Sequence, residues 1–151
     1  MEKSQLNSRN RFFRFAVVGV SGTIVDFSIF FLLSRIFGFP KNTSYSISFI
    51  IAVVNNFIWN RNWTYPESKE KNVSEQLIKF TIVSIVGFFI RKIVFPFINK
   101  PLIDFSKLLF GQRFFIKPEA IGDFLALGFV IIVVLFWNYF INRIWTYKDI
   151  E

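Results

Sequence analysis

Four long apolar stretches run along the chain, and shorter polar or charged segments separate them. The stretches cover residues 12–37, 44–60, 77–98 and 120–144. A helix that crosses a bilayer needs about 20 mostly apolar residues, and the four stretches are close to that length. The pattern therefore predicts an all-α membrane protein with four transmembrane helices.

Polar segments set the expected ends of these helices. Residues 38–42, GFPKN, hold Gly and Pro and predict a turn. Residues 65–76 form a charged linker, in which Pro66 discourages the second helix from continuing. We expect the third helix to bend at Pro96 and to give way to a loop over residues 99–119. That loop mixes charges with Phe and Leu, so it is expected to lie partly at the membrane surface, with a short amphipathic helix as the alternative.

The composition supports a membrane location and narrows the chemistry. The chain has 151 residues, of which 53% are hydrophobic and 23 are Phe, too many for one small soluble core to hide. It has no Cys and no His, so thiol sites, zinc sites and nucleophiles activated by His are excluded. It also has no G-x-x-x-x-G-K-[ST] phosphate loop. We therefore expect a protein that is not an enzyme and that holds no metal or cofactor.

The net charge of +8 indicates an anionic partner. The aromatic residues lie inside apolar stretches and not on basic polar faces, which disfavours nucleic acid and favours lipid or phosphate. Four helices place both termini on the same side of the membrane. Lys and Arg are more numerous on that side, which also holds the 65–76 linker, so the positive-inside rule predicts cytoplasmic termini.

An internal repeat organises the chain. Residues 56–65 read NFIWNRNWTY and residues 138–147 read NYFINRIWTY. Upstream of each, RFAVVGVSG (14–22) is similar to KFTIVSIVG (79–87). We therefore expect one domain over residues 1–151, built from two helical hairpins. Because each repeat holds two spans, both have the same membrane orientation, and their pseudo-axis runs along the membrane normal. Repeat one covers about residues 12–65 and repeat two about residues 77–147.

Charged residues fall inside two of the predicted spans. Asp26 lies near the middle of the first, and an offset of 65 residues between the repeats aligns it with Arg91, which Lys92 follows. An isolated charge inside a bilayer is costly, so we expect Asp26 to meet Arg91 or Lys92 within the bundle. Such a pair could hold the helices together, or it could line a polar path for a sugar.

Small residues suggest how the first helix packs. Ala16, Gly19, Thr23 and Asp26 follow a 3-4-3 spacing, which places them on one helix face. Small residues let two membrane helices approach closely. We therefore expect this face of the first helix to point into the bundle.

Two pairs of asparagines close the second and fourth spans. Asn56 and Asn60 are four residues apart, and Asn138 and Asn142 repeat that spacing, so each pair lies on one helix face. Amides in a bilayer must find hydrogen-bond partners. They could tie helices together, or they could line a cleft for sugar hydroxyl groups, which need both donors and acceptors.

Four cations lie at the predicted membrane surface. Arg61 and Arg143 follow the asparagines, and Arg14 and Lys79 begin the first and third spans at the same level. A guanidinium suits bidentate phosphate binding, so the four cations form a candidate phosphate site, with simple anchoring of helix ends as the alternative. The aromatic residues of the two decapeptides are interpreted as an interfacial belt: Trp63, Tyr65, Trp145 and Tyr147.

Taken together, these motifs resemble those of the GtrA-like family of small four-helix membrane proteins. The resemblance spans residues 11–147 and rests on FRFAVVGVSGTIVDF, NNFIWNRNWTY, KFTIVSIVG and NYFINRIWTY. It implies movement of a polyprenyl-phosphate-linked sugar across the bacterial cytoplasmic membrane, for cell-envelope polysaccharides. It also implies membrane lipids and the glycosyltransferases of the same pathway as partners. The matching positions are Arg14, Gly19, Asp26, Asn56, Asn60, Arg61, Lys79, Asn138, Asn142 and Arg143.

The leading hypothesis is therefore a flippase for a lipid-linked sugar. Without a nucleotide-binding motif, transport would run downhill, and a homo-oligomer is one way to complete a path that four helices alone enclose poorly. The first alternative is a membrane scaffold that recruits a glycosyltransferase and transports nothing. The second is a small exporter of cations or drugs, in which Asp26 would be the titrating carboxylate.

Overall fold

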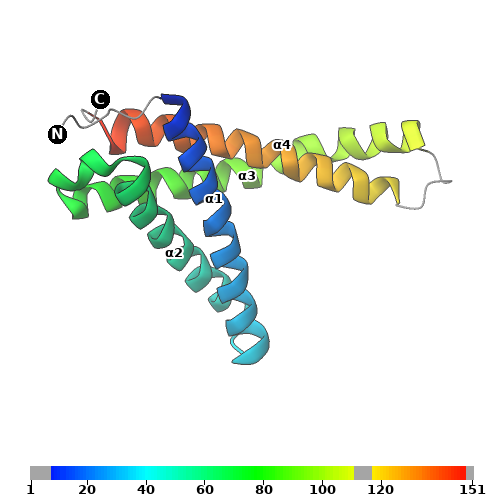
Figure 1. Cartoon of the computed structure of the whole chain (residues 1–151). Helices are drawn as coiled ribbons and strands as arrows, with labels where there is room; N and C mark the ends of the chain where they lie inside the picture. The colour runs from blue at the N-terminus through cyan, green and yellow to red at the C-terminus, as the bar shows by residue number, and fades with distance from the viewer. Residues whose placement is uncertain (1–7, 111–116, 149–151) are drawn as a thin grey trace. The chain divides into compact units, whose positions relative to one another are not determined.

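The computed structural model describes residues 8–110 and 117–148, and nearly all of them are helical (Figure 1). The long helices are α1 (Ser8–Phe31), α2 (Lys41–Trp59), α3 (Val73–Phe110) and α4 (Pro118–Ile141). The described residues contain no strand. The prediction of an all-α protein is thus confirmed, and each predicted span has a helix over it.

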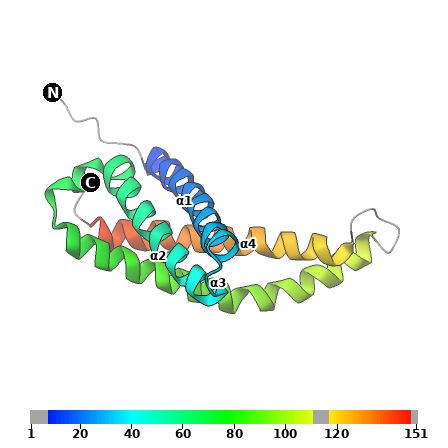
Figure 2. The same ribbon diagram turned by 90° about the horizontal axis from the view of Figure 1, so that it is seen from below.

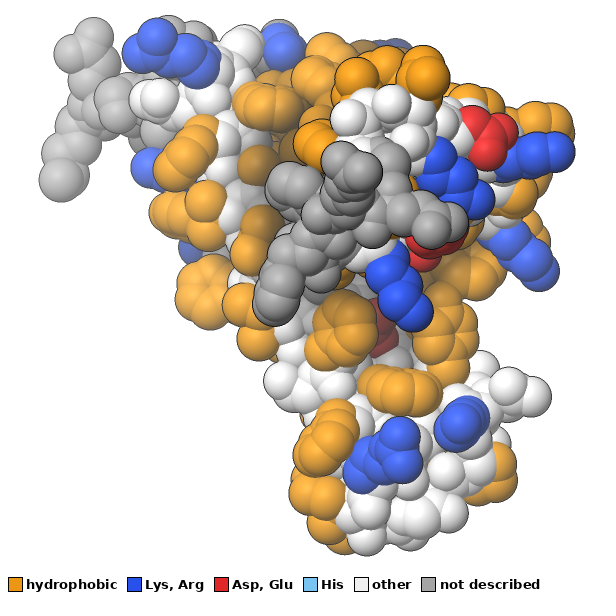
Figure 3. Space-filling view, turned by 90° about the vertical axis from the view of Figure 1, so that its right-hand side faces the viewer, with side chains coloured by type: hydrophobic (Ala, Val, Ile, Leu, Met, Phe, Trp, Pro, Cys, Tyr) orange, Lys and Arg blue, Asp and Glu red, His pale blue; other side chains and the backbone are white. Residues whose placement is uncertain are grey.

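Among the described residues, three helical runs are long and apolar enough to cross a membrane: Ser8–Ile36, Val73–Phe110 and Pro118–Thr146. Helix α2 is shorter and less apolar, because its sequence includes three serines and three asparagines. Hydrophobic side chains cover much of the face drawn in Figure 3, as lipid-facing helices require. The fourth membrane span therefore stays a prediction, whereas three spans have the length and composition of transmembrane helices.

The described residues fall into two compact units. Unit 1 holds residues 8–82 and 141–148, and unit 2 holds residues 83–110 and 117–140. The boundary passes through α3 and near the end of α4, so it does not follow the two sequence repeats. Each unit is described by itself below.

Helices α1 and α2 of unit 1 form a hairpin (Figure 2). A π-helical turn, η1 (Leu32–Ile36), ends α1, and Gly38 follows with φ = +70°, a conformation that favours Gly. Pro40 then precedes α2 with φ = −54°, the value that its ring imposes. The predicted Gly-Pro turn is therefore confirmed.

The buried face of α1 differs from the expected one. Its buried residues are Arg11, Phe15, Val18 and Gly22. Thr23 is exposed, and a Cβ added at Gly19 would meet no neighbouring atom within 4 Å. A Cβ at Gly22, by contrast, would overlap the Asn56 amide of α2. The close-packing face predicted from small residues was wrong, because packing followed the row that contains Gly22.

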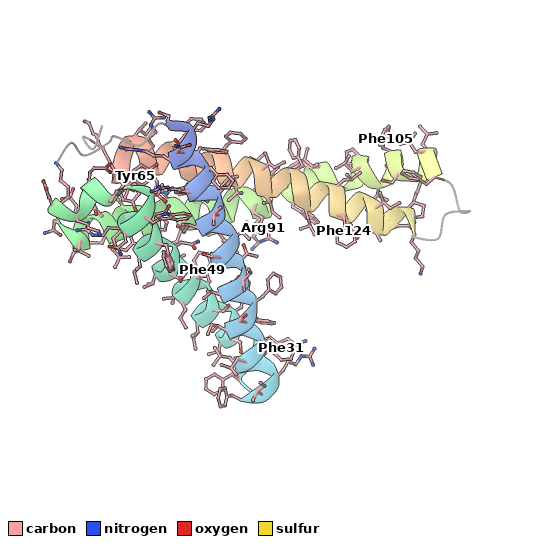
Figure 4. The ribbon with its side chains drawn as sticks, in the orientation of Figure 1. Phe31, Phe49, Tyr65, Arg91, Phe105 and Phe124 are labelled. Carbon is pink, nitrogen blue, oxygen red and sulfur yellow. The ribbon has the colours of Figure 1, made fainter. Side chains whose placement is uncertain are left out.

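Unit 2 is an antiparallel pair made of α3 from Val83 onward and α4 up to Phe140 (Figure 2). Gly122 of α4 lies so close to Ile103 that an added Cβ would stand 2.6 Å from its Cα. The Asn99 amide nitrogen donates to Asp123 Oδ1 at 2.6 Å, and the Trp137 indole donates to the Val83 carbonyl at 3.2 Å. Many of its exposed side chains are large and apolar, such as Phe105 and Phe124 (Figure 4).

The loop predicted over residues 99–119 was wrong for most of its length. Helix α3 continues through Pro96 and Pro101 to Phe110, and residues 111–116 lie outside the described residues. Each proline removes one N–H donor, a loss that membrane helices tolerate where neighbouring groups compensate. Here α4 packs along the same segment, through Gly122 and an ion pair at 3.2 Å between Lys107 and Glu119. Tertiary contacts therefore keep this segment helical.

We predict that Gly122→Ala lowers the free energy of unfolding by about 1–3 kcal/mol, because the new methyl group overlaps the Ile103 backbone. Gly128→Ala, in the same helix, is the matched control, since a Cβ there meets no atom within 4 Å. Thermal unfolding in detergent should show a lower Tm for Gly122→Ala and an equal or higher Tm for Gly128→Ala. Equal effects at both positions would contradict the close approach.

Candidate functional site

The two decapeptides adopt the same conformation. After α2, residues Asn60–Thr64 form a π-helical turn, η2, and after α4, residues Asn142–Thr146 form the equivalent turn, η5. In each, the N–H of the following tyrosine donates to the asparagine carbonyl at 2.8 Å: Tyr65 to Asn60, and Tyr147 to Asn142. The sequence repeat is therefore also a structural repeat, and both copies belong to unit 1.

The tyrosines that end the decapeptides stack on each other. The ring centroids of Tyr65 and Tyr147 are 4.1 Å apart at 15°, and the residues are 1% and 2% exposed. Burial raises the pKa of the Tyr147 phenol far above its ordinary value. The interpretation of these two tyrosines as an interfacial belt was wrong, whereas Trp63 and Trp145 are exposed as a belt requires.

A set of buried polar residues lies at the helix ends and in the linker of unit 1, and we call them the polar junction. They come from the ends of helices in unit 1: Arg11, Asn60, Arg61, Thr64, Ser68, Gln76, Asn142 and Thr146. Buried polar groups are stable only when hydrogen-bonded, so this end of unit 1 depends on specific pairing. Figure 4 labels Tyr65, which follows the end of α2.

Arg61 holds the linker between α2 and α3. Its guanidinium donates to Gln76 Oε1 and to the carbonyls of Lys69 and Lys71, at 2.9 and 3.0 Å for the carbonyls. The linker contains a short 3-10 helix, η3 (Pro66–Glu70), and Arg61 itself is only 8% exposed. Phosphate binding by Arg61 stays a prediction, but a phosphate would have to compete with three acceptors already in place.

Arg11 is a junction residue that the sequence reasoning missed. It is 3% exposed, its Nη2 lies 3.5 Å from Glu67 Oε1, and its guanidinium lies 5.5 Å from the centre of the Tyr65 ring. The offset of 65 residues that aligns the repeats places Gln76, the partner of Arg61, at the equivalent position. Arg11 contacts Glu67, and Gln76 donates to the Ser68 carbonyl at 3.5 Å, so the aligned positions meet neighbouring residues of the linker. The repeat alignment is the signal that could have found them.

The other predicted phosphate cations also belong to unit 1. Arg14 donates from Nη1 to the Trp63 carbonyl at 2.8 Å and lies over the Trp63 ring, 5.2 Å from its centre. Lys79 pairs with Glu75 at 2.6 Å. Arg143 lies in η5 and is half-buried. The structure therefore assembles the four cations in one unit, in which Arg14, Arg61 and Lys79 each contact different local partners.

The asparagines occupy two kinds of position. Asn60 and Asn142 are buried at the start of the π-helical turns, and Asn142 Oδ1 accepts a hydrogen bond from Thr146 Oγ1 at 2.7 Å. The other two lie one turn earlier, each over a glycine of the neighbouring helix. These are Asn56 over Gly22 in unit 1 and Asn138 over Gly87 in unit 2. These contacts favour the helix-tying role, and a cleft for sugar hydroxyls stays a prediction.

The intramembrane charges lie in different units. Asp26, in unit 1, has a buried Oδ1 without a hydrogen-bond partner among the described residues. Arg91 and Lys92, in unit 2, are exposed, and Figure 4 labels Arg91 on α3. The meeting of Asp26 with either cation therefore stays a prediction. Within residues 8–110 and 117–148, no three His, Cys, Asp or Glu side chains gather as metal ligands would.

Comparison with known families decides the classification. The model of the GtrA/DPMS transmembrane domain matches residues 14–147, which include both decapeptides. The chain belongs to the GtrA/DPMS family. The GtrA-like resemblance noted from the motifs is thus confirmed, and the chain is a membrane protein with transmembrane helices.

Two relatives of this GtrA/DPMS domain were found. One is the uncharacterized membrane protein YngA of Bacillus subtilis (strain 168), 36% identical over 76 residues, which are 49% of each chain. The other is a dolichol-phosphate mannosyltransferase of Pyrococcus furiosus, 29% identical over 86 residues, which are 57% of this chain and 24% of that protein. The chain thus matches about half of the first relative's length and about a quarter of the second's.

We predict that Arg61→Met lowers the free energy of unfolding by about 2–4 kcal/mol, because it leaves one buried and two part-buried acceptors without their donor. Arg35→Met, at the exposed end of the α1–α2 hairpin, is the control and should have little effect. Thermal unfolding in detergent measures both. An unchanged Tm for Arg61→Met would show that the linker does not depend on this guanidinium.

Proposed function

We propose that this protein moves a polyprenyl-phosphate-linked sugar between the leaflets of the bacterial cytoplasmic membrane, with both termini in the cytoplasm. The observation that carries the proposal is the GtrA/DPMS match over residues 14–147. The similarity to a dolichol-phosphate mannosyltransferase supports it, because dolichol phosphate is itself a polyprenyl phosphate. The proposed role is transport and not catalysis.

The cations of unit 1 are suited to binding the lipid phosphate. Arg14 and Arg143 are only partly buried, so their guanidinium groups can reach a phosphate at the membrane surface. Arg61 would act indirectly, because it holds the linker beside them. The phosphate would dock at these helix ends while the prenyl chain stays in lipid.

Polar groups within the helices are suited to accepting hydrogen bonds from the sugar. Asn56 has a buried Oδ1 without a hydrogen-bond partner among the described residues, and so has Asp26. Unsatisfied acceptors in a bilayer are costly, and sugar hydroxyl groups are suitable donors for them. With no nucleotide-binding motif in the sequence, consumption of the sugar on the far side would drive the movement.

A second candidate function is a membrane scaffold for a glycosyltransferase. The match to only 24% of a mannosyltransferase favours it, because the chain then corresponds to one portion of a larger protein. The linker offers a docking surface, since Lys69, Glu70 and Lys71 are exposed and Arg61 fixes the backbone beneath them.

We predict that the purified protein, reconstituted in liposomes, speeds the appearance of a labelled polyprenyl-phosphate sugar in the opposite leaflet. Arg143→Ala should slow this movement by about tenfold, because a charge-assisted hydrogen bond to phosphate is lost. Arg35→Ala removes a cation from the other end of unit 1 and should leave the rate unchanged.

The scaffold function gives a different result in the same assay. Folded wild-type protein would then move lipid no faster than empty liposomes, and the flippase proposal would be overturned. Retention of a pathway glycosyltransferase by the wild type, lost when Lys69 and Lys71 are both changed to Glu, would support the scaffold instead.

A further inference from the structure

The sequence duplication allows a comparison between two basic sites, both of which lie in unit 1. Arg14 begins repeat one and Lys79 begins repeat two, at equivalent positions 65 residues apart. The exit of each repeat carries the motif Asn-Arg-x-Trp-Thr. If the sites were equivalent, both cations would have similar partners. The structure shows that they do not.

Arg14 keeps its positive charge uncompensated. Its Nη1 donates to the Trp63 carbonyl at 2.8 Å, and its guanidinium lies over the Trp63 ring. Neither partner carries a negative charge, and no carboxylate among residues 8–110 and 117–148 pairs with Arg14. A guanidinium has five N–H donors, so four remain for another acceptor.

Lys79 is neutralised by its own helix. Its Nζ lies 2.6 Å from Glu75 Oε1, one turn earlier in α3. The pair has no net charge, and the ammonium already donates to a carboxylate. The residue one turn before Arg14 is Asn10, which is uncharged and exposed. A single position per repeat, Asn10 against Glu75, therefore makes the two basic sites different.

We infer that the two basic sites have different roles. Arg14 with Trp63 binds the phosphate of the lipid substrate, and Lys79 with Glu75 does not. This inference rests on the proposed function. The ring and the carbonyl of Trp63 hold the guanidinium on one side, so its free edge is preorganised for two phosphate oxygens. The exposed indole is suited to the same interfacial depth, where the phosphate joins the apolar prenyl chain.

The test measures retention of a polyprenyl phosphate by native mass spectrometry of the full-length protein in phosphatidylcholine nanodiscs. Arg14→Gln should weaken binding by about tenfold, as expected for loss of a charge-assisted hydrogen bond. Lys79→Gln should change it by less than about twofold, because the ammonium already donates to the exposed carboxylate of Glu75.

Two exchanges separate charge from structural damage. Asn10→Glu copies the carboxylate of repeat two into repeat one, at an exposed position, and should weaken binding by several-fold although Arg14 remains. Glu75→Asn copies repeat one into repeat two and should leave binding unchanged or stronger. An equal loss for Lys79→Gln and Arg14→Gln would overturn the inference, as would full binding by Asn10→Glu.

Phosphatidylglycerol added in place of the polyprenyl phosphate identifies the source of the phosphate. Weaker binding of phosphatidylglycerol supports the substrate site, whereas equal binding with the same dependence on Arg14 would mean simple lipid anchoring and would overturn it. The result is independent of transport. Binding at Arg14 without movement in liposomes would refute the proposed function alone, and movement that ignores Arg14 would refute this inference alone.

Discussion

The stack of Tyr65 on Tyr147 is the contact on which the rest of unit 1 depends. It joins the ends of the two decapeptides, which are more than 80 residues apart in the chain. Polar side chains at these helix ends also lose access to water, so the hydrogen bonds that they make stabilise this end of the unit. Each copy of the decapeptide supplies an asparagine that begins a π-helical turn and a tyrosine that closes it.

The arginines of unit 1 have distinct roles despite their similar surroundings in the sequence. Arg61 and Arg11 are buried, and each contacts the linker or its first residues, so they fix the segment that connects the repeats. Arg14 lies against Trp63, and only one of its five N–H groups donates to the Trp63 carbonyl. A motif with several cations is therefore partly a structural element, and only its exposed members are available to an anionic lipid.

Glycines set the helix separations in both units. Gly22 admits the Asn56 amide and Gly87 admits Asn138, so the two repeats use the same small-residue contact beside a polar side chain. In unit 2, Gly122 brings α4 against the α3 backbone beyond Pro96 and Pro101. Close backbone approach of this kind is a general source of cohesion between helices in a bilayer, where apolar side chains gain nothing by leaving lipid.

The sequence by itself determined the helices, the duplication and the family, because apolar length, turn residues and repeated motifs are properties of the linear chain. It also identified four cations that the structure places in one unit: Arg14, Arg61, Lys79 and Arg143. Tertiary structure decided which face of α1 is buried, that α3 continues past its prolines, and that the tyrosines stack instead of lying at the interface. It also decided that Lys79 is paired with a carboxylate, whereas Arg14 donates to a neutral carbonyl. Those outcomes depend on neighbours distant in sequence, as with Arg61 and Gln76 or Gly122 and Ile103, and no local pattern specifies them.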